Sequence, residues 1–201
     1  MVSHFVLLFW FGYLKDTSDS PLLLRFYNLQ KECYTNLPFR ENSIKAIVMT
    51  DVLHHIPDVR LFFYEASRCL LPGGKIIMVE PWGSAWGKYI YTHLHHEPFD
   101  LSVKSWRFPF QGPLSSANDA LPTIIFKRDI CLFMEEFPQF EIEVIKPGYP
   151  FRYLVSGGVS MRQLMPDWTI GIWKTIESIF TPYMDTWGMF AIISIKKAVN
   201  W

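Results

Sequence analysis

The stretch SIKAIVMTDVLHHIPDVRLFFYEASRCLLPGGKIIMVE, residues 43–80, decides the expected fold. Residues 43–50 form a short apolar run rich in β-branched side chains, which is typical of a fully buried strand. Residues 58–71 place apolar side chains at helical spacing, with Asp58 as the N-cap and a Pro-Gly-Gly sequence as the stop. Residues 75–80 read as a second buried strand. We therefore expect a parallel βαβ unit with a right-handed crossover.

The composition fits a folded α/β protein and excludes several classes. The 201 residues are 50% hydrophobic and 17% aromatic, which argues against disorder. Nineteen basic and nineteen acidic residues leave no net charge, and the absence of a basic stripe argues against nucleic acid binding. Cys33, Cys69 and Cys131 make neither a disulfide framework nor a paired metal spacing, so we expect a reducing, cytoplasmic location.

The N-terminal apolar run, Phe5 to Phe11, is much shorter than the roughly 20 residues that span a bilayer. It also lacks the basic start and the small-residue cleavage site of a signal peptide. We interpret it as a buried strand or a short helix. Peripheral contact with a membrane surface is the alternative, and no transmembrane segment is expected.

The rest of the chain adds further elements and two insertions. Patterning predicts a helix over 126–137, a strand over 140–146 and a last strand over 189–198 that is covered on both faces. Residues 1–201 are expected to form one domain, with a core at 37–80, 126–146 and 188–198. The insertions are residues 81–125 and residues 147–187, and the second contains an expected helix over 168–180.

Several short motifs in register resemble the class I S-adenosylmethionine-dependent methyltransferases, in the group called type 11. They are a Leu-Pro-Phe turn, a Leu-His-His turn, an Arg near the end of a helix and a Pro-Gly-Gly hairpin, found here at Leu37–Phe39, Leu53–His55, Arg68 and Pro72–Gly74. The resemblance implies a Rossmann-like α/β fold, mostly parallel with an antiparallel last strand and helices on both faces. It also implies S-adenosylmethionine as cofactor and methyl transfer to a small-molecule acceptor, such as a saccharide or a lipid-linked intermediate.

The chain departs from the family pattern at its start. The family places a glycine-rich turn after its first strand, but the first 36 residues here contain one glycine, Gly12. The fold is therefore expected to be incomplete. A non-catalytic fragment or degenerate relative that acts as an interaction module is the alternative function, and an unpaired sheet edge would favour a homodimer. By position in the family pattern, Asp16 or Asp19 is the candidate for the ribose contact, with Asp19 taken here, and Cys33 and Tyr34 occupy the places that contact the adenine.

The carboxyl ends of parallel strands indicate where a ligand would bind, because ligands of open α/β sheets lie beyond those ends. Thr50 and Asp51 end one expected strand, Glu80 ends the next, and His54 follows in the loop. These four are the remaining candidates for cofactor contacts. His55 is the candidate catalytic base, because a neutral imidazole suits proton removal from a hydroxyl acceptor. Capping or packing of the following helix is the structural alternative for either histidine.

A second polar group lies in YTHLHHEPFD, residues 91–100. His96 and Glu97 are taken as candidate catalytic residues that contact the acceptor. A solvated helix end is the structural alternative. No metal is expected, because Pro98 interrupts the helix and no distant second cluster offers a further ligand.

The two insertions also hold six of the eight tryptophans: Trp82, Trp86, Trp106, Trp168, Trp173 and Trp187. An aromatic lid over a bulky acceptor is one interpretation. A small second core over the sheet is the other, and composition favours it slightly.

Overall fold

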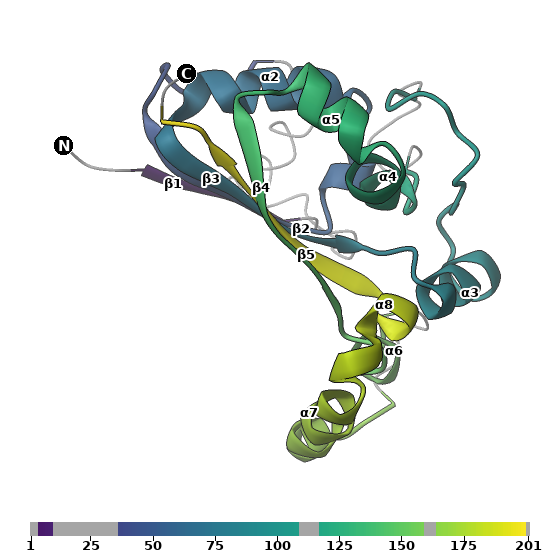
Figure 1. Cartoon of the computed structure of the whole chain (residues 1–201). Coiled ribbons are helices and arrows are strands. Elements are labelled where there is room, and N and C mark those ends of the chain that lie inside the picture. The colour runs from purple at the N-terminus through teal and green to yellow at the C-terminus, as the bar shows by residue number, and fades with distance from the viewer. Residues whose placement is uncertain (1–3, 10–35, 109–116, 159–163, 200–201) are drawn as a thin grey trace, which may run out of the picture.

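A computed structural model describes residues 4–9, 36–108, 117–158 and 164–199 of the chain. Its centre is a five-stranded sheet in the order β1-β2-β3-β5-β4 (Figure 1). The strands are β1 (His4–Phe9), β2 (Ile44–Thr50), β3 (Leu70–Pro81), β4 (Phe140–Gly148) and β5 (Phe190–Lys197).

The strand directions confirm the expected fold class. β1, β2 and β3 are mutually parallel, whereas β5 is antiparallel to both β3 and β4. It follows that β4 points the same way as β3. The last strand is enclosed between two neighbours and is buried along most of its length, as predicted. The strand reading of the N-terminal run is also confirmed, at His4–Phe9.

The βαβ unit forms as the sequence predicts. α2 (Val59–Cys69) connects β2 to β3, and Asp58 caps it by accepting a hydrogen bond from the Leu61 N–H at 3.3 Å. In Figure 1, α2 lies with α4 and α5 over one face of the sheet. The buried side of α2 enters the main core, where the Phe63 ring packs against four rings from outside α2, those of Phe126, Phe133, Phe137 and Phe140.

The helix expected over 126–137 is shorter than predicted. It is α5 (Ile130–Glu136), preceded by the single turn α4 (Leu121–Thr123) and by a π-helical turn, η2 (Ile124–Arg128). The Asp129 N–H donates to the Ile124 carbonyl at 2.8 Å, which closes the wide turn. Asp129 also accepts a hydrogen bond from the Trp106 indole at 2.9 Å. The contact between Asp129 and Trp106 of the first insertion therefore sets the point where the helix is interrupted. The spacing of apolar residues could not predict this point.

Both insertions rise from the same edge of the sheet, because they leave the carboxyl ends of the like-directed strands β3 and β4. The first carries α3 (Ala85–His93). The second carries, in chain order, α6 (Arg152–Val155), η3 (Asp167–Thr169), α7 (Ile170–Ile179), η4 (Thr181–Tyr183) and α8 (Met184–Trp187). The helix expected over 168–180 is thus confirmed as η3 and α7.

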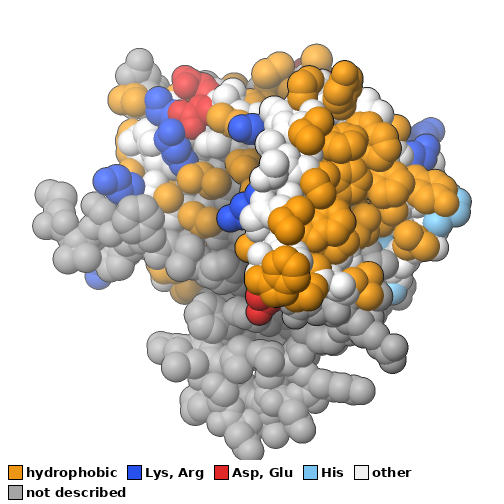
Figure 2. Space-filling view, turned by 90° about the horizontal axis from the view of Figure 1, so that it is seen from below, with side chains coloured by type: hydrophobic (Ala, Val, Ile, Leu, Met, Phe, Trp, Pro, Cys, Tyr) orange, Lys and Arg blue, Asp and Glu red, His pale blue; other side chains and the backbone are white. Residues whose placement is uncertain are grey.

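The tryptophans divide between burial and exposure. Trp82 and Trp106 belong to the main core, and the Trp86 and Trp187 rings pack 5.4 Å apart beside a second apolar cluster. Trp168 is exposed near α7. Figure 2, which views the molecule from below Figure 1, shows hydrophobic side chains gathered on one face. No helix within the described ranges is long and apolar enough to cross a bilayer.

A guanidinium clamp holds the Leu-Pro-Phe turn against α2. Arg68 donates to the carbonyls of Phe39 at 2.9 Å and Leu37 at 3.0 Å. Its partner Glu65, 2.7 Å from the Arg68 guanidinium, accepts the Leu37 N–H at 3.0 Å. Two motifs that are separate in the sequence are therefore one interaction in the fold.

Replacing Arg68 by Met should lower the free energy of unfolding by about 1–2 kcal/mol, because two carbonyls lose a charged donor. Urea unfolding followed by circular dichroism measures the change. Arg107→Met is the matched control, since Arg107 is exposed and lies 3.5 Å from Asp58 in a loose ion pair. We expect the control to change stability by less than about 0.5 kcal/mol. Equal losses of unfolding free energy in the two variants would contradict the stabilising role of the Arg68 clamp.

Candidate functional site

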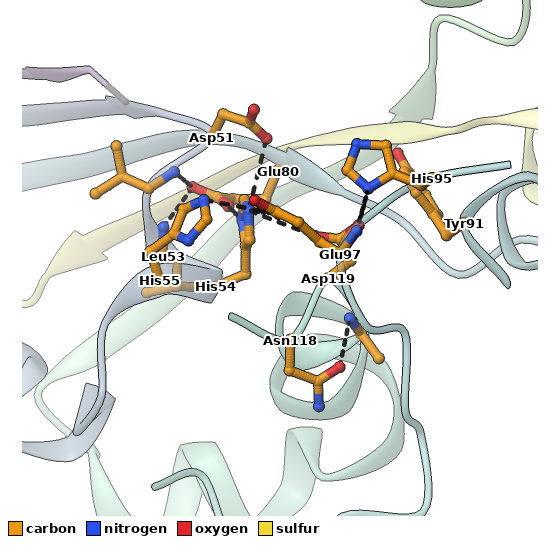
Figure 3. A network of polar contacts seen from close by, with 12 residues as sticks. Asp51, Leu53, His54, His55, Glu80, Tyr91, His95, Glu97, Asn118 and Asp119 are labelled. Carbon is orange, nitrogen blue, oxygen red and sulfur yellow. Dashed lines mark hydrogen bonds and ion pairs between the residues drawn. The ribbon is translucent and has the colours of Figure 1, made fainter. Parts of the chain in front are cut away.

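A fully buried carboxylate organises the edge where β2 and β3 end. Glu80, near the end of β3, accepts the backbone N–H groups of Val52 at 2.9 Å and Leu53 at 2.8 Å through Oε1. Its Oε2 lies 2.8 Å from Nδ1 of His54 (Figure 3). Because a carboxylate only accepts, Nδ1 of His54 carries the proton. Glu80 therefore fixes both the backbone of η1 (Leu53–His55) and the orientation of the His54 ring.

The other nitrogen of His54 faces acidic side chains from three different segments. Nε2 lies 3.5 Å from Oδ1 of Asp119, 3.6 Å from Oε2 of Glu97 and 3.9 Å from Oδ1 of Asp51. The His54 side chain is only 1% exposed. Asp51 has a φ of 60°, a left-handed conformation that Asp tolerates better than most residues and that ends β2 sharply. Four acidic groups, counting Glu80, thus surround one buried imidazole.

Backbone contacts tie the insertion to this edge. The Asn118 N–H donates to the His54 carbonyl at 3.1 Å, and the Asp119 N–H donates to the Pro98 carbonyl at 3.0 Å. The Asn118 side chain accepts the Asp100 N–H at 2.9 Å and donates to the Asp100 carbonyl at 2.9 Å. These bonds hold the segments around residues 95–100 and 118–120 against η1, as Figure 3 shows.

The two adjacent histidines have opposite electrostatic environments. Burial opposes charge on His54, yet its contacts with Glu80 and Glu97 raise the pKa of this imidazole well above the usual value. Burial and the neighbouring His54 lower the pKa of His55 to about 3. His54 therefore favours the charged form, and His55 is neutral at physiological pH.

The carboxyl groups also differ from one another. Burial raises the pKa of Asp51 to about 6, and burial likewise raises the pKa of Asp119. Burial alone would raise the pKa of Glu97, but its contact with His54 and the proximity of His55 lower it to about 2. Perturbed groups of both signs in one place are typical of functional sites.

Five of the ten expected site residues lie close together. Asp51, His54 and Glu80 each offer a ligand atom within one 4.8 Å group, and so do His54, His55 and Glu97. His55 Nε2 lies 3.8 Å from Oε2 of Glu97.

The other candidates lie at the margin or outside. His96 is 62% exposed and lies beyond the end of α3, with its Nε2 3.7 Å from Oε1 of Glu97. Thr50 is exposed at the end of β2. Asp19, Cys33 and Tyr34 lie outside the residues that the structure describes.

Sequence reasoning missed two members of the site. Asp119 is 1% exposed, and its Oδ2 lies 3.0 Å from Nδ1 of His95. His95 was visible only as one of three histidines in a short segment, and Asp119 lies in a loop with no periodic pattern. The signal that could have found Asp119 is a charged residue set between Asn118 and an apolar Ala-Leu-Pro run. His95, Glu97 and Asp119 form a third group of side chains with metal-ligand chemistry.

Replacing Glu80 by Gln should lower the free energy of unfolding by roughly 2–4 kcal/mol. The amide is isosteric, but it places a donor among three donors in a buried site. Glu143→Gln is the control for the same substitution at an exposed position, because Glu143 on β4 pairs with Lys75 at 2.8 Å. We expect a change within about 1 kcal/mol for the control. Chemical unfolding of both variants measures the difference, and a Glu80 variant as stable as the control would refute the organising role.

Structural searches return S-adenosylmethionine-dependent methyltransferases with low similarity. Geranyl diphosphate C-methyltransferase from Streptomyces coelicolor A3(2) is 15% identical, with a TM-score of 0.43, over 82% of this chain and 49% of that one. A methyltransferase from Methanosarcina mazei is 16% identical, with a TM-score of 0.44, over 84% of this chain and 66% of that one. One from Thermotoga maritima is 15% identical, with a TM-score of 0.44, over 82% and 61%. The chain spans about half to two thirds of the length of these proteins.

A search of curated protein sequences found no match. The family model described as "Methyltransferase domain" matches residues 14–78. This segment contains β2, α2, most of β3 and the Leu-His-His turn that supplies His54 and His55. Residues 14–78 thus carry the sequence pattern of a methyltransferase domain, in agreement with the motifs between Leu37 and Gly74.

Proposed function

We propose that this chain takes part in methyl transfer from S-adenosylmethionine to a small-molecule acceptor. The observation that carries the proposal is the cluster of His54, His55, Glu97 and Asp51 at the carboxyl edge of β2 and β3, within and beside the segment that matches the family model. In an open parallel sheet this edge is where ligands bind.

The cofactor side of the proposed site is the carboxyl end of β2, on the flank of the site where β1 lies. Thr50 and Asp51 lie there, and Asp51 is placed by its left-handed backbone conformation. A carboxylate at this position could accept hydrogen bonds from a nucleoside. Glu80 is too deeply buried to reach a ligand, so we assign it an indirect role through His54. Asp19, Cys33 and Tyr34 stay proposed cofactor contacts on the strength of the family resemblance alone.

The acceptor side is proposed to be the opposite flank, where Glu97 and His55 meet. A neutral His55 can accept a hydrogen bond from an acceptor hydroxyl, and the Glu97 carboxylate lies beside it at 3.8 Å. His96, at the exposed rim, is placed to contact a larger acceptor. Methyl transfer depends mainly on holding two reactants at attack distance, which is worth about 7–11 kcal/mol in favourable cases. The insertions on this edge are suited to that task, and a saccharide or lipid-linked acceptor fits their aromatic content.

Isothermal titration calorimetry with S-adenosylhomocysteine tests the proposal. We expect saturable binding with a Kd below about 100 µM, equivalent to more than about 5 kcal/mol. Asp51→Asn keeps the left-handed backbone accessible but removes the charge, and should weaken binding about tenfold. Asp185→Asn, at an exposed position on α8, is the matched control and should bind as the unaltered chain does. No heat of binding at millimolar ligand would contradict the proposal and favour an interaction module.

A further inference from the structure

We propose that His54, His55 and Glu97 bind one divalent transition-metal ion beside the Asp119 carboxylate, with Zn²⁺ as the representative species. Metal binding does not depend on the methyl transfer proposed above. Only the location of the ion on the acceptor side rests on that proposal.

The surroundings of His54 match those of a metal-binding histidine. Metal-bound imidazoles almost always donate their second ring N–H to a carboxylate or carbonyl, which fixes the ring orientation. Nδ1 of His54 has that partner in Glu80 at 2.8 Å, and Glu80 is itself held by two backbone N–H groups. Nε2 is left pointing at the Glu97 and Asp119 carboxylates (Figure 3). The ring is thus oriented by one carboxylate toward a space that two others border, and an ion entering this space displaces the Nε2 proton of the charged imidazole into solvent.

The distances within this space suit an ion better than direct hydrogen bonds. Nε2 of His54 lies 3.5 Å from Asp119 Oδ1 and 3.6 Å from Glu97 Oε2, and His55 Nε2 lies 3.8 Å from the same Glu97 oxygen. Charged hydrogen bonds between such groups are normally about 2.7–2.9 Å long. Ligand atoms about 2.0–2.2 Å from a tetrahedral zinc ion lie about 3.3–3.6 Å apart. The His54–Glu97 and His55–Glu97 separations are close to the edges of a coordination polyhedron, and these three residues offer ligand atoms that all lie within 4.8 Å of one another.

Asp119 supplies an independent indication. Its carboxylate is 1% exposed, yet neither oxygen accepts a hydrogen bond of good geometry from the part of the chain that the structure describes. His95 Nδ1, 3.0 Å from Oδ2, orients the group. Oδ1 is directed at the same space as Nε2 of His54. A buried carboxylate with so little compensation costs stability unless a cation joins it.

The donor set also indicates the class of ion. Two imidazole nitrogens and one carboxylate oxygen, with water in the fourth position, suit Zn²⁺ and its transition-metal neighbours, whereas Mg²⁺ prefers an all-oxygen octahedron that retains water. The sequence alone predicted no metal, because no distant second cluster offered a further ligand to residues 91–100. The fold supplies that cluster from η1 and from the loop containing Asp119.

The test is Zn²⁺ titration by calorimetry of the 201-residue chain after treatment with EDTA, with metal content checked by mass spectrometry. We expect one Zn²⁺ per chain and an affinity at least 100-fold higher than for Mg²⁺. Glu97→Gln and His55→Asn should each weaken Zn²⁺ binding at least tenfold. The matched control is His93→Asn, at an exposed histidine on α3 whose Nδ1 contacts the Tyr89 carbonyl. It should bind Zn²⁺ within about twofold of the unaltered chain.

Co²⁺ substitution guards against misfolded variants, because it uses the unaltered chain. A four-coordinate nitrogen and oxygen site should give visible d–d absorption that an equivalent of Zn²⁺ abolishes. Less than about 0.1 Zn²⁺ per chain, binding that survives both ligand substitutions, or equal loss in the His93 variant would overturn the proposal. So would a preference for Mg²⁺. Calorimetry with S-adenosylhomocysteine before and after EDTA separates the two proposals, since failure of cofactor binding leaves the Zn²⁺ result unaffected.

Discussion

The arrangement of the site depends on one buried carboxylate, that of Glu80. An unpaired charge at such a position would be strongly unfavourable, so its three hydrogen-bond donors are obligatory. Those donors are two consecutive backbone N–H groups and one imidazole, all from the turn that follows β2. One carboxylate from β3 therefore joins two neighbouring strands at their carboxyl ends. It fixes the turn that follows β2, and this turn holds His54 and His55 against the insertions.

The same constraint explains why two remote segments meet here. The first insertion returns to the sheet edge twice, around Glu97 and around Asp119, and backbone hydrogen bonds secure both returns. Each return brings an acid toward the same imidazole. Opposite charge attracts these acids to His54, and burial raises the energy of any arrangement that leaves them unpaired. The polar cluster is thus a consequence of topology and charge together.

The sequence predicted the sheet more completely than the site. Local patterns fixed the βαβ unit because β-branched runs, the Asp58 cap and helical spacing are short-range signals. The same patterns placed Asp51, His54 and Glu80 at one edge, because the ends of parallel strands coincide. The π-turn before α5 and the role of Asp119 could not be predicted. Both depend on contacts between residues far apart in the chain, such as Trp106 with Asp129 and Asp119 with His54. His96 adjoins Glu97 in the sequence, but α3 ends at His93 and leaves His96 at the rim.

Hydrogen–deuterium exchange with and without S-adenosylhomocysteine is the most direct measurement of the central claim, that the edge organised by Glu80 is the ligand side of the sheet. The account predicts slower exchange in peptides covering residues 50–56 and 80–84, whose backbone surrounds the Glu80 carboxylate. It predicts little change at the amino ends of β2 and β4, which lie at the opposite end of the sheet from that edge. Protection confined to those amino ends, or no protection at residues 50–56 under saturating ligand, would contradict the account.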